Sequence, residues 1–173
     1  MIKRCAFICS FIVLSVLGTA IYIYSYSECS VLLKDKKRIF GEQEWVKLSP
    51  IPHPLKARID SGANTSSISA TDIESFEKEG EKWVQFRIEH GKNKSEILSH
   101  PVERIVRIRQ STSKKLDTRY VVKLPITVGD LTQLSEFTLR DRRHLTFPVL
   151  IGRSYLEEKA LVDVSQTYLQ PIL

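Results

Sequence analysis

After the N-terminal segment, hydrophobic and polar residues alternate far more often than they recur at the spacing of a helix. Residues 82–89 place Val84, Phe86 and Ile88 on one face, as a half-buried strand does. Further strands are predicted at 44–48, 56–60, 66–70, 104–109, 119–124, 126–128, 134–139 and 147–151. Only residues 154–160 suggest a helix, of two turns at most. This pattern predicts an all-β fold, a closed or partly closed β-barrel with one short C-terminal helix.

The N-terminal segment differs from the rest of the chain. Residues 5–26 contain no charged side chain and are long enough to cross a bilayer as a helix. Two interpretations compete, a cleaved secretory signal and a retained signal anchor. We favour the anchor, because the apolar run is longer than a usual signal core and no clear small-x-small cleavage site follows it. Because Lys3 and Arg4 favour a cytoplasmic N-terminus, we place the domain outside the cytoplasm. The predicted order is a cytoplasmic tail at 1–4, a transmembrane helix at 5–26, a basic linker at 27–39 and a domain at 40–173.

The formal net charge of +6 raises the question of a nucleic-acid partner. Residues 1–39 hold six Lys and Arg against two Asp and Glu, so most of the excess lies beside the apolar segment, where it suits anionic lipid head groups. Within the domain, residues 87–123 carry ten basic and four acidic residues, which fits either an acidic substrate or a solvated strand face. We therefore expect no nucleic-acid partner.

The residue types needed for several other chemistries are missing or scattered. All three cysteines, Cys5, Cys9 and Cys29, lie in or beside the apolar segment, which excludes a soluble thiol enzyme. The four histidines lack the spacing of zinc ligands, and no phosphate-binding Gly-x-x-x-x-Gly-Lys motif occurs. We expect neither a bound metal nor another cofactor.

Two segments carry the candidate chemistry. Residues 60–63, Asp-Ser-Gly-Ala, follow the alternating stretch 55–59, so that a strand delivers a carboxylate into a sharp turn. Alone, such a string also occurs in ordinary turns. Residues 148–153, Pro-Val-Leu-Ile-Gly-Arg, form an apolar strand that ends in Gly-Arg. Together the two segments resemble the two-part signature of retropepsin-like aspartic peptidases.

The resemblance extends over residues 40–170, which are similar to a bacterial family of retropepsin-like proteins. Its members are often labelled ATP-dependent zinc proteases and are associated with RimK-type ATP-grasp ligases. The matching segments include residues 44–48, 56–67, 83–86, 150–153, 161–163 and 168–169. The resemblance implies a closed retropepsin-like barrel, a homodimer and peptidase activity. In a bacterium, the predicted anchor would be single-pass in the inner membrane, with the domain in the periplasm.

The resemblance also implies roles for the first segment. Asp60 is the expected catalytic carboxylate, Ser61 braces paired loops, Gly62 forms the turn, and Ala63 leaves space beside the cleft. Aspartic peptidases need two carboxylates that share a proton, and this chain supplies one such loop. A symmetric homodimer, with one Asp60 from each chain, is the direct solution.

Other residues are expected to support or complete this site. After Gly152, Arg153 is expected to hold the loop through Asn64. Asp163 is either a second carboxylate or a turn acid that belongs to a late strand. The flap over the cleft is expected between about residues 83 and 122.

The sequence thus predicts a membrane-anchored aspartic endopeptidase that hydrolyses peptide bonds with water activated by paired Asp60 carboxylates. The alternative is a non-catalytic module that binds a peptide or an acidic tail, as an accessory to an ATP-grasp ligase or an envelope system.

Overall fold

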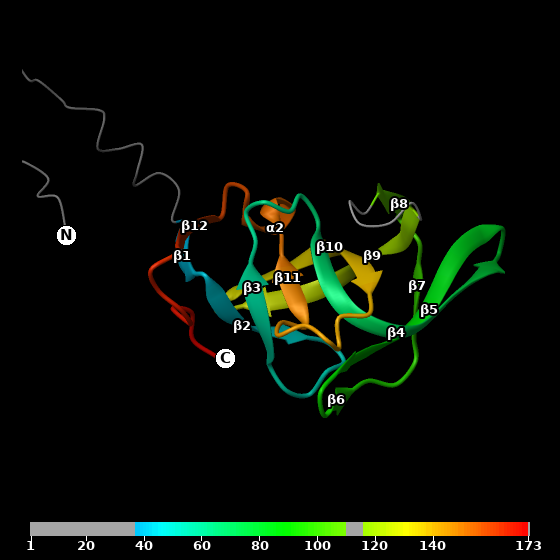
Figure 1. Ribbon diagram of the computed structural model, residues 1–173, viewed down its shortest axis with the longest axis horizontal. Helices are drawn as coiled ribbons and strands as arrows, with labels where there is room; N and C mark the ends of the chain where they lie inside the picture. Colours follow the sequence, from blue (N-terminus) through cyan, green and yellow to red (C-terminus); the bar gives the residue numbers. More distant parts are fainter. Residues whose placement is uncertain (1–36, 110–115, 173) are drawn as a thin grey trace, which may run out of the picture. The chain divides into compact units, whose positions relative to one another are not determined.

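The computed structural model describes residues 37–109 and 116–172. The alternating segments form strands, as predicted, and one short helix follows late in the chain (Figure 1). The elements are β1 Arg38–Gly41, β2 Gln43–Leu48, β3 Leu55–Ile59, β4 Ser66–Lys78, β5 Glu81–His90, β6 Asn93–Lys94, β7 Leu98–Pro101, β8 Arg104–Arg109, β9 Leu116–Val128, β10 Leu131–Arg140, β11 Val149–Ile151, α2 Arg153–Leu156 and β12 Ala160–Asp163.

Six of these strands close into a barrel. Their pairings run in the order β10-β9-β2-β3-β11-β4, and a parallel pairing of β4 with β10 completes the ring. β3 is also parallel to β11, which lies between β3 and β4 (Figure 1). The prediction of an all-β closed barrel with one short helix is confirmed.

The alternation of the sequence decides which side chains enter the barrel. Leu55, Ala57 and Ile59 of β3 are buried, whereas Lys56 and Arg58 between them are exposed. The core continues with apolar side chains of the neighbouring strands, and burying each such side chain stabilises the fold by about 1.5–3 kcal/mol. Its largest fully buried members are Tyr155, Phe40, Phe86 and Phe137.

Two of the differences from the prediction have a clear physical cause. β9 runs as a single strand through Pro125, because β2 pairs only with Ile126 and Thr127, so the missing N–H of proline is not needed on that side. The predicted helix at 154–160 is shorter, since Glu158 adopts a φ of +61° and the chain then enters β12.

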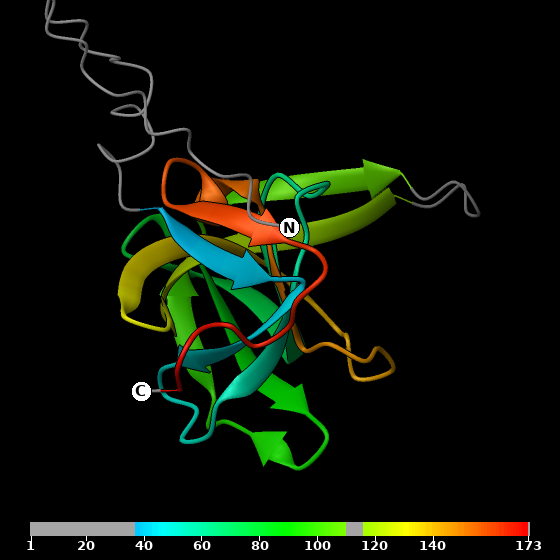
Figure 2. The ribbon, with the colours of Figure 1, turned by 90° about the vertical axis from the view of Figure 1, so that its left-hand side faces the viewer.

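Two hairpins extend from the barrel. β4 continues past a register shift between Thr71 and Glu74 and pairs with β5, and Gly80 supplies a positive φ of +79° at the turn. β8 pairs with the first half of β9, and Figure 2 shows this second hairpin from the side. The second hairpin lies within the range in which a flap is expected.

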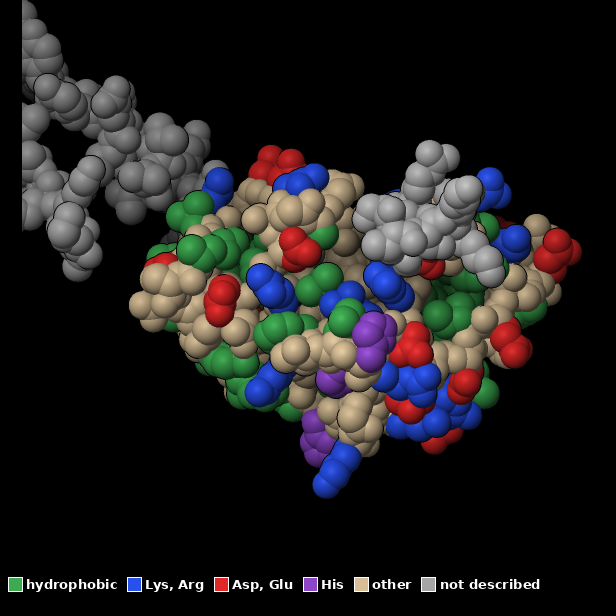
Figure 3. Space-filling view, in the orientation of Figure 1, with side chains coloured by type: hydrophobic (Ala, Val, Ile, Leu, Met, Phe, Trp, Pro, Cys, Tyr) green, Lys and Arg blue, Asp and Glu red, His purple; other side chains and the backbone are tan. Residues whose placement is uncertain are grey.

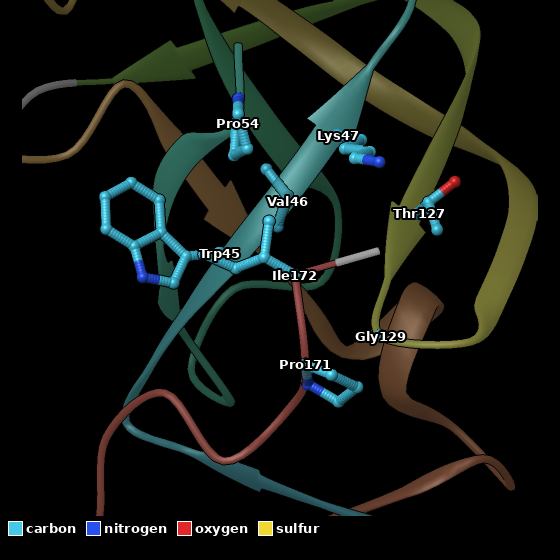
Figure 4. Close-up of a pocket in the computed structure, with 8 residues that line it drawn as sticks. All are labelled: Trp45, Val46, Lys47, Pro54, Thr127, Gly129, Pro171 and Ile172. Atoms are coloured by element: carbon cyan, nitrogen blue, oxygen red, sulfur yellow. The ribbon is translucent and has the colours of Figure 1, made fainter.

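The ends of the domain pack together. β1 and β12 form a separate parallel two-stranded sheet, visible in Figure 2. The chain then crosses β2, where Pro171 and Ile172 lie beside residues 45–47 at a cavity of about 10 Å³ (Figure 4). Such a cavity has room for about one water molecule, so it is not a ligand site.

The predicted tail at 1–4 and transmembrane helix at 5–26 lie outside the described residues, as does most of the linker at 27–39. Within the described part of the chain, no helix is long and apolar enough to span a bilayer.

Candidate active site

The Asp60 loop begins where β3 leaves the barrel. Because β3 and β11 are parallel, their C-terminal ends meet at one edge, and this brings the loop beside Gly152 and Arg153. The Asp60 N–H donates to the carbonyl oxygen of Ile151 at 2.9 Å. The two sequence segments are therefore neighbours in space, as their interpretation requires.

The two oxygens of the Asp60 carboxylate have different environments. Oδ1 accepts hydrogen bonds from the N–H groups of Gly62 and Ala63, at 3.0 and 3.2 Å. Oδ2 has no hydrogen-bond partner among the described residues, and the side chain is only partly buried. A side chain at Gly62 would crowd this arrangement, because its Cβ would lie 3.2 Å from Oδ1. One oxygen is thus fixed, and the other is open to water or a second carboxyl group.

The guanidinium of Arg153 holds the loop through its main chain. Nη1 donates to the carbonyl oxygens of Ser61 and Gly62, at 3.0 and 3.1 Å. The backbone adds two bonds, from Arg153 N–H to Ala63 O at 2.9 Å and from Ser154 N–H to Asn64 O at 3.0 Å. The expected contact through the Asn64 side chain is therefore replaced by contacts to carbonyl groups.

Gly152 lies against the end of the loop. Its N–H donates to the hydroxyl of Ser66 at 3.0 Å, and a Cβ at this position would lie 2.8 Å from the carbonyl carbon of Thr65. That distance is shorter than real contacts allow, so only glycine fits here without movement of the loop backbone.

Asp163 lies elsewhere. It ends β12, where it pairs with Gly41 of β1, and its Oδ1 accepts bonds from the N–H and hydroxyl of Ser165. These two bonds lower the pKa of Asp163 and are typical of a turn acid. Within the described ranges, no hydrogen bond joins Asp163 to the Asp60 loop.

Two further polar residues near the loop were not found by the sequence analysis. Ser66 is fully buried under Gly152, and Arg104 at the base of β8 donates to the Thr65 hydroxyl at 2.8 Å and contacts Glu136 at 2.7 Å. Only Ser66 had a sequence signal, a polar residue within a strand that begins directly after the loop.

The zinc that the family label implies does not fit these residues. In the described part of the chain, no three His, Cys, Asp or Glu side chains are grouped to hold a metal ion. The ring of His90 bonds to the Leu145 carbonyl, and His100 packs on Phe86, while His53 and His144 are exposed loop residues.

The closed barrel, with its aspartate loop held by the following Gly-Arg segment, defines a retropepsin-like protein. Residues 39–172 match the family described as retropepsin-like aspartic endopeptidase RimB. The chain belongs to this RimB-like family.

Similar proteins were found among curated sequences and solved structures. A probable alpha-L-glutamate ligase of Shewanella halifaxensis is 34% identical over 139 residues, which cover 79% of this chain and 30% of that protein. A protein of Desulfotalea psychrophila with the same name is 32% identical over 130 residues, 73% of this chain and 28% of its own length. This chain thus spans less than a third of these relatives. A crystal structure of a Legionella pneumophila protein of unknown function is similar with a TM-score of 0.65 and 25% identity, over 76% of this chain and 97% of that chain.

Proposed function

We propose that two copies of this chain form an aspartic endopeptidase in which each copy contributes one Asp60. The observation that carries the proposal is the environment of the Asp60 carboxylate, with Oδ1 fixed by two N–H groups and Oδ2 left open. Asp163, the rival for the second carboxylate, is held in its own turn by Ser165. A second copy of Asp60 is then the proposed source of the second acid, and the exposed Ser61 is proposed to brace the paired loops.

In this mechanism the two carboxyl groups share one proton. The ionised one takes a proton from water, whose oxygen bonds to the scissile carbonyl carbon. The protonated one gives its proton to the carbonyl oxygen, which yields a tetrahedral diol. The diol then returns a proton to one carboxylate, the amide nitrogen takes the proton of the other carboxyl group, and the C–N bond breaks. The donors to Oδ1 keep the orientation of each carboxyl group fixed throughout.

We further propose that the substrate is an acidic peptide or protein segment. The support comes from the relatives named as glutamate ligases and from the basic balance of residues 87–123. Residues 5–26 are proposed to anchor the chain in the inner membrane, with the domain in the periplasm, where tethering would raise the local concentration of the two copies.

The test compares Asp60→Asn with Asp163→Asn on internally quenched glutamate-rich peptides. We expect Asp60→Asn to abolish cleavage and Asp163→Asn to retain it, since only the first carboxylate reacts. Full activity in Asp60→Asn would refute the proposal. If Asp60→Asn still binds the peptides and the wild-type protein cleaves none of them, the chain is the non-catalytic binding module instead.

The origin of the second carboxylate is tested by mixing subunits. Wild-type and Asp60→Asn chains with different tags are co-expressed in varied ratios. If each site needs Asp60 from both chains, activity per total protein falls as the square of the wild-type fraction. A linear fall would show that one chain suffices.

A further inference from the structure

The β8–β9 hairpin is attached to the rest of the fold at its base, where β8 begins. Arg104, the first residue of β8, lies opposite Val121 at the last pairing of the hairpin. Its guanidinium contacts Glu136 of β10, with Nη2 at 2.7 Å and Nε at 3.2 Å from Oε2. The same Nη2 donates to the hydroxyl of Thr65 at 2.8 Å. One side chain therefore connects the hairpin, the barrel and the Asp60 loop.

Thr65 is the last residue of the Asp60 loop, which spans residues 60–65 between β3 and β4. Earlier residues of this loop are held by Arg153 and by the backbone of Ser154. Within residues 37–109 and 116–172, the bond from Arg104 to Thr65 is the only side-chain hydrogen bond between the β8–β9 hairpin and the loop. The hairpin and the loop lie at the same end of the domain (Figure 1 and Figure 2). They are thus joined at one point.

Two other side-chain contacts at the base of the hairpin lead away from the loop. Lys123 of β9 donates to the carboxylate of Glu103, directly before β8, at 2.8 Å. The hydroxyl of Tyr120 donates to the hydroxyl of Ser75 on β4 at 3.0 Å. Acidic and basic side chains are interspersed over the face that Figure 3 shows, so charge alone does not single out a functional arginine. The distinction lies in what each side chain touches.

We propose that Arg104 is a positioning residue, which holds the β8–β9 hairpin beside the Asp60 loop so that a bound peptide meets both. The inference rests on the proposed function for the role of Asp60. A peptide that binds between two separate segments must order them, and a link that orders them beforehand reduces this cost. Arg104 contacts Thr65 rather than the Asp60 carboxylate, so it affects peptide binding more than the chemical step.

The first test measures amide hydrogen exchange in the full-length protein without peptide. The N–H groups of Arg153 and Ser154 report on the loop, because they donate to its carbonyl oxygens. We expect Arg104→Gln to accelerate their exchange about 5- to 10-fold, as the loss of one hydrogen bond to a charged group at an exposed site suggests. The matched controls are Lys123→Gln, which removes one charge, and Tyr120→Phe, which removes one hydroxyl. Each should change this exchange by less than about 2-fold.

The second test measures cleavage of the internally quenched glutamate-rich peptides. We expect Arg104→Gln to raise KM about 5- to 10-fold while kcat stays within about 2-fold of the wild-type value, because the link acts on binding. Thr65→Val should have the same effect, and Thr65→Ser, which keeps the hydroxyl, should retain a KM close to that of the wild type. The double variant Arg104→Gln with Thr65→Val should be no worse than either single variant, since both remove the same bond.

Unchanged exchange at Arg153 and Ser154 in Arg104→Gln, or an equal change in both controls, would overturn the inference. Additive effects in the double variant, or a fall in kcat at an unchanged KM, would also overturn it. Because the Arg104 side chain is 42% exposed, we expect Arg104→Gln to fold; if it does not, Thr65→Val removes the same bond from the other side. If the wild type cleaves none of the peptides, the proposed function fails, and the exchange test still decides whether Arg104 holds the hairpin to the loop.

Discussion

Glu44 on β2 is a fully buried carboxylate that connects the two ends of the domain. Oε1 accepts the N–H groups of Gly41 and Leu169, at 2.7 and 3.1 Å, and Oε2 accepts the N–H of Gln170 at 3.1 Å. We predict that Glu44→Ala detaches the C-terminal segment from β2 and destabilises the domain.

The magnitude follows from these three bonds. A hydrogen bond to a charged group contributes about 1.5–3 kcal/mol, and a buried donor left without a partner costs about 1–3 kcal/mol. The Gly41 N–H is buried, while those of Leu169 and Gln170 can regain water if the segment moves away. We therefore expect Glu44→Ala to lower the free energy of unfolding by about 3–5 kcal/mol. Glu44→Gln keeps one accepting oxygen but turns an NH₂ group toward the Gln170 N–H, so its cost should be about 1–3 kcal/mol.

Urea unfolding of the wild type and both variants measures these differences, and amide hydrogen exchange locates them. Exchange should accelerate most at Gly41, Leu169 and Gln170, ahead of the barrel strands. The reasoning is refuted if the free energy of unfolding of Glu44→Ala lies within about 1 kcal/mol of the wild-type value while its slope with urea concentration is unchanged. Equal losses in the two variants would refute the separate counting of the two carboxylate oxygens.

Three further predictions concern the loop support and the titrating groups. Gly152→Ala should cost about 1–3 kcal/mol, because its Cβ would overlap the loop backbone, and it should also reduce peptide cleavage; thermal unfolding and activity assays test both effects. Burial raises the pKa of Tyr155, so the stabilisation that comes from keeping this phenol protonated is present below the ordinary tyrosine pKa of about 10 and is lost as the pH rises above it. In the folded protein, this phenol should not contribute to the ultraviolet tyrosinate band until the protein unfolds. Tyr155→Phe should therefore leave the titration of the folded protein unchanged. Hydrogen bonds from Arg143 lower the pKa of Asp141 to about 2. The small stabilisation from this exposed pair should therefore be present above pH about 4 and lost as the pH falls toward 2. In the variant Arg143→Gln, an NMR titration should show a higher pKa for Asp141.

Most strands could be predicted from alternation, because a strand with one buried face repeats every two residues. Proline misled this reasoning at residue 125, since the sequence does not reveal which positions of a strand need their N–H group. The strand at residues 160–163 is predicted only as the alternative interpretation of Asp163, a late strand with a turn acid. It forms because Ala160 and Val162 pack against the core and β1 provides a pairing partner.

The candidate site was predictable where it is contiguous in sequence. Asp60 and Gly152 belong to short segments with turn residues at fixed positions, and those segments do meet in space. Arg104 could not be found in this way, because it acquires its role from groups that the fold brings close, the Thr65 hydroxyl and the Glu136 carboxylate.

Ser66 contributes both to the closure of the barrel and to the positioning of the Asp60 loop. It is the first residue of β4, it pairs with Phe137 in the strand contact that closes the ring, and its carbonyl oxygen accepts the hydroxyl of Thr138 at 3.2 Å. Its own hydroxyl accepts the N–H of Gly152, which abuts the loop. One chain can therefore complete its barrel and fix its carboxylate without a partner. Under the proposed function, the second carboxylate is the component that folding of a single chain does not supply, so association of two chains would control catalysis without having to control folding.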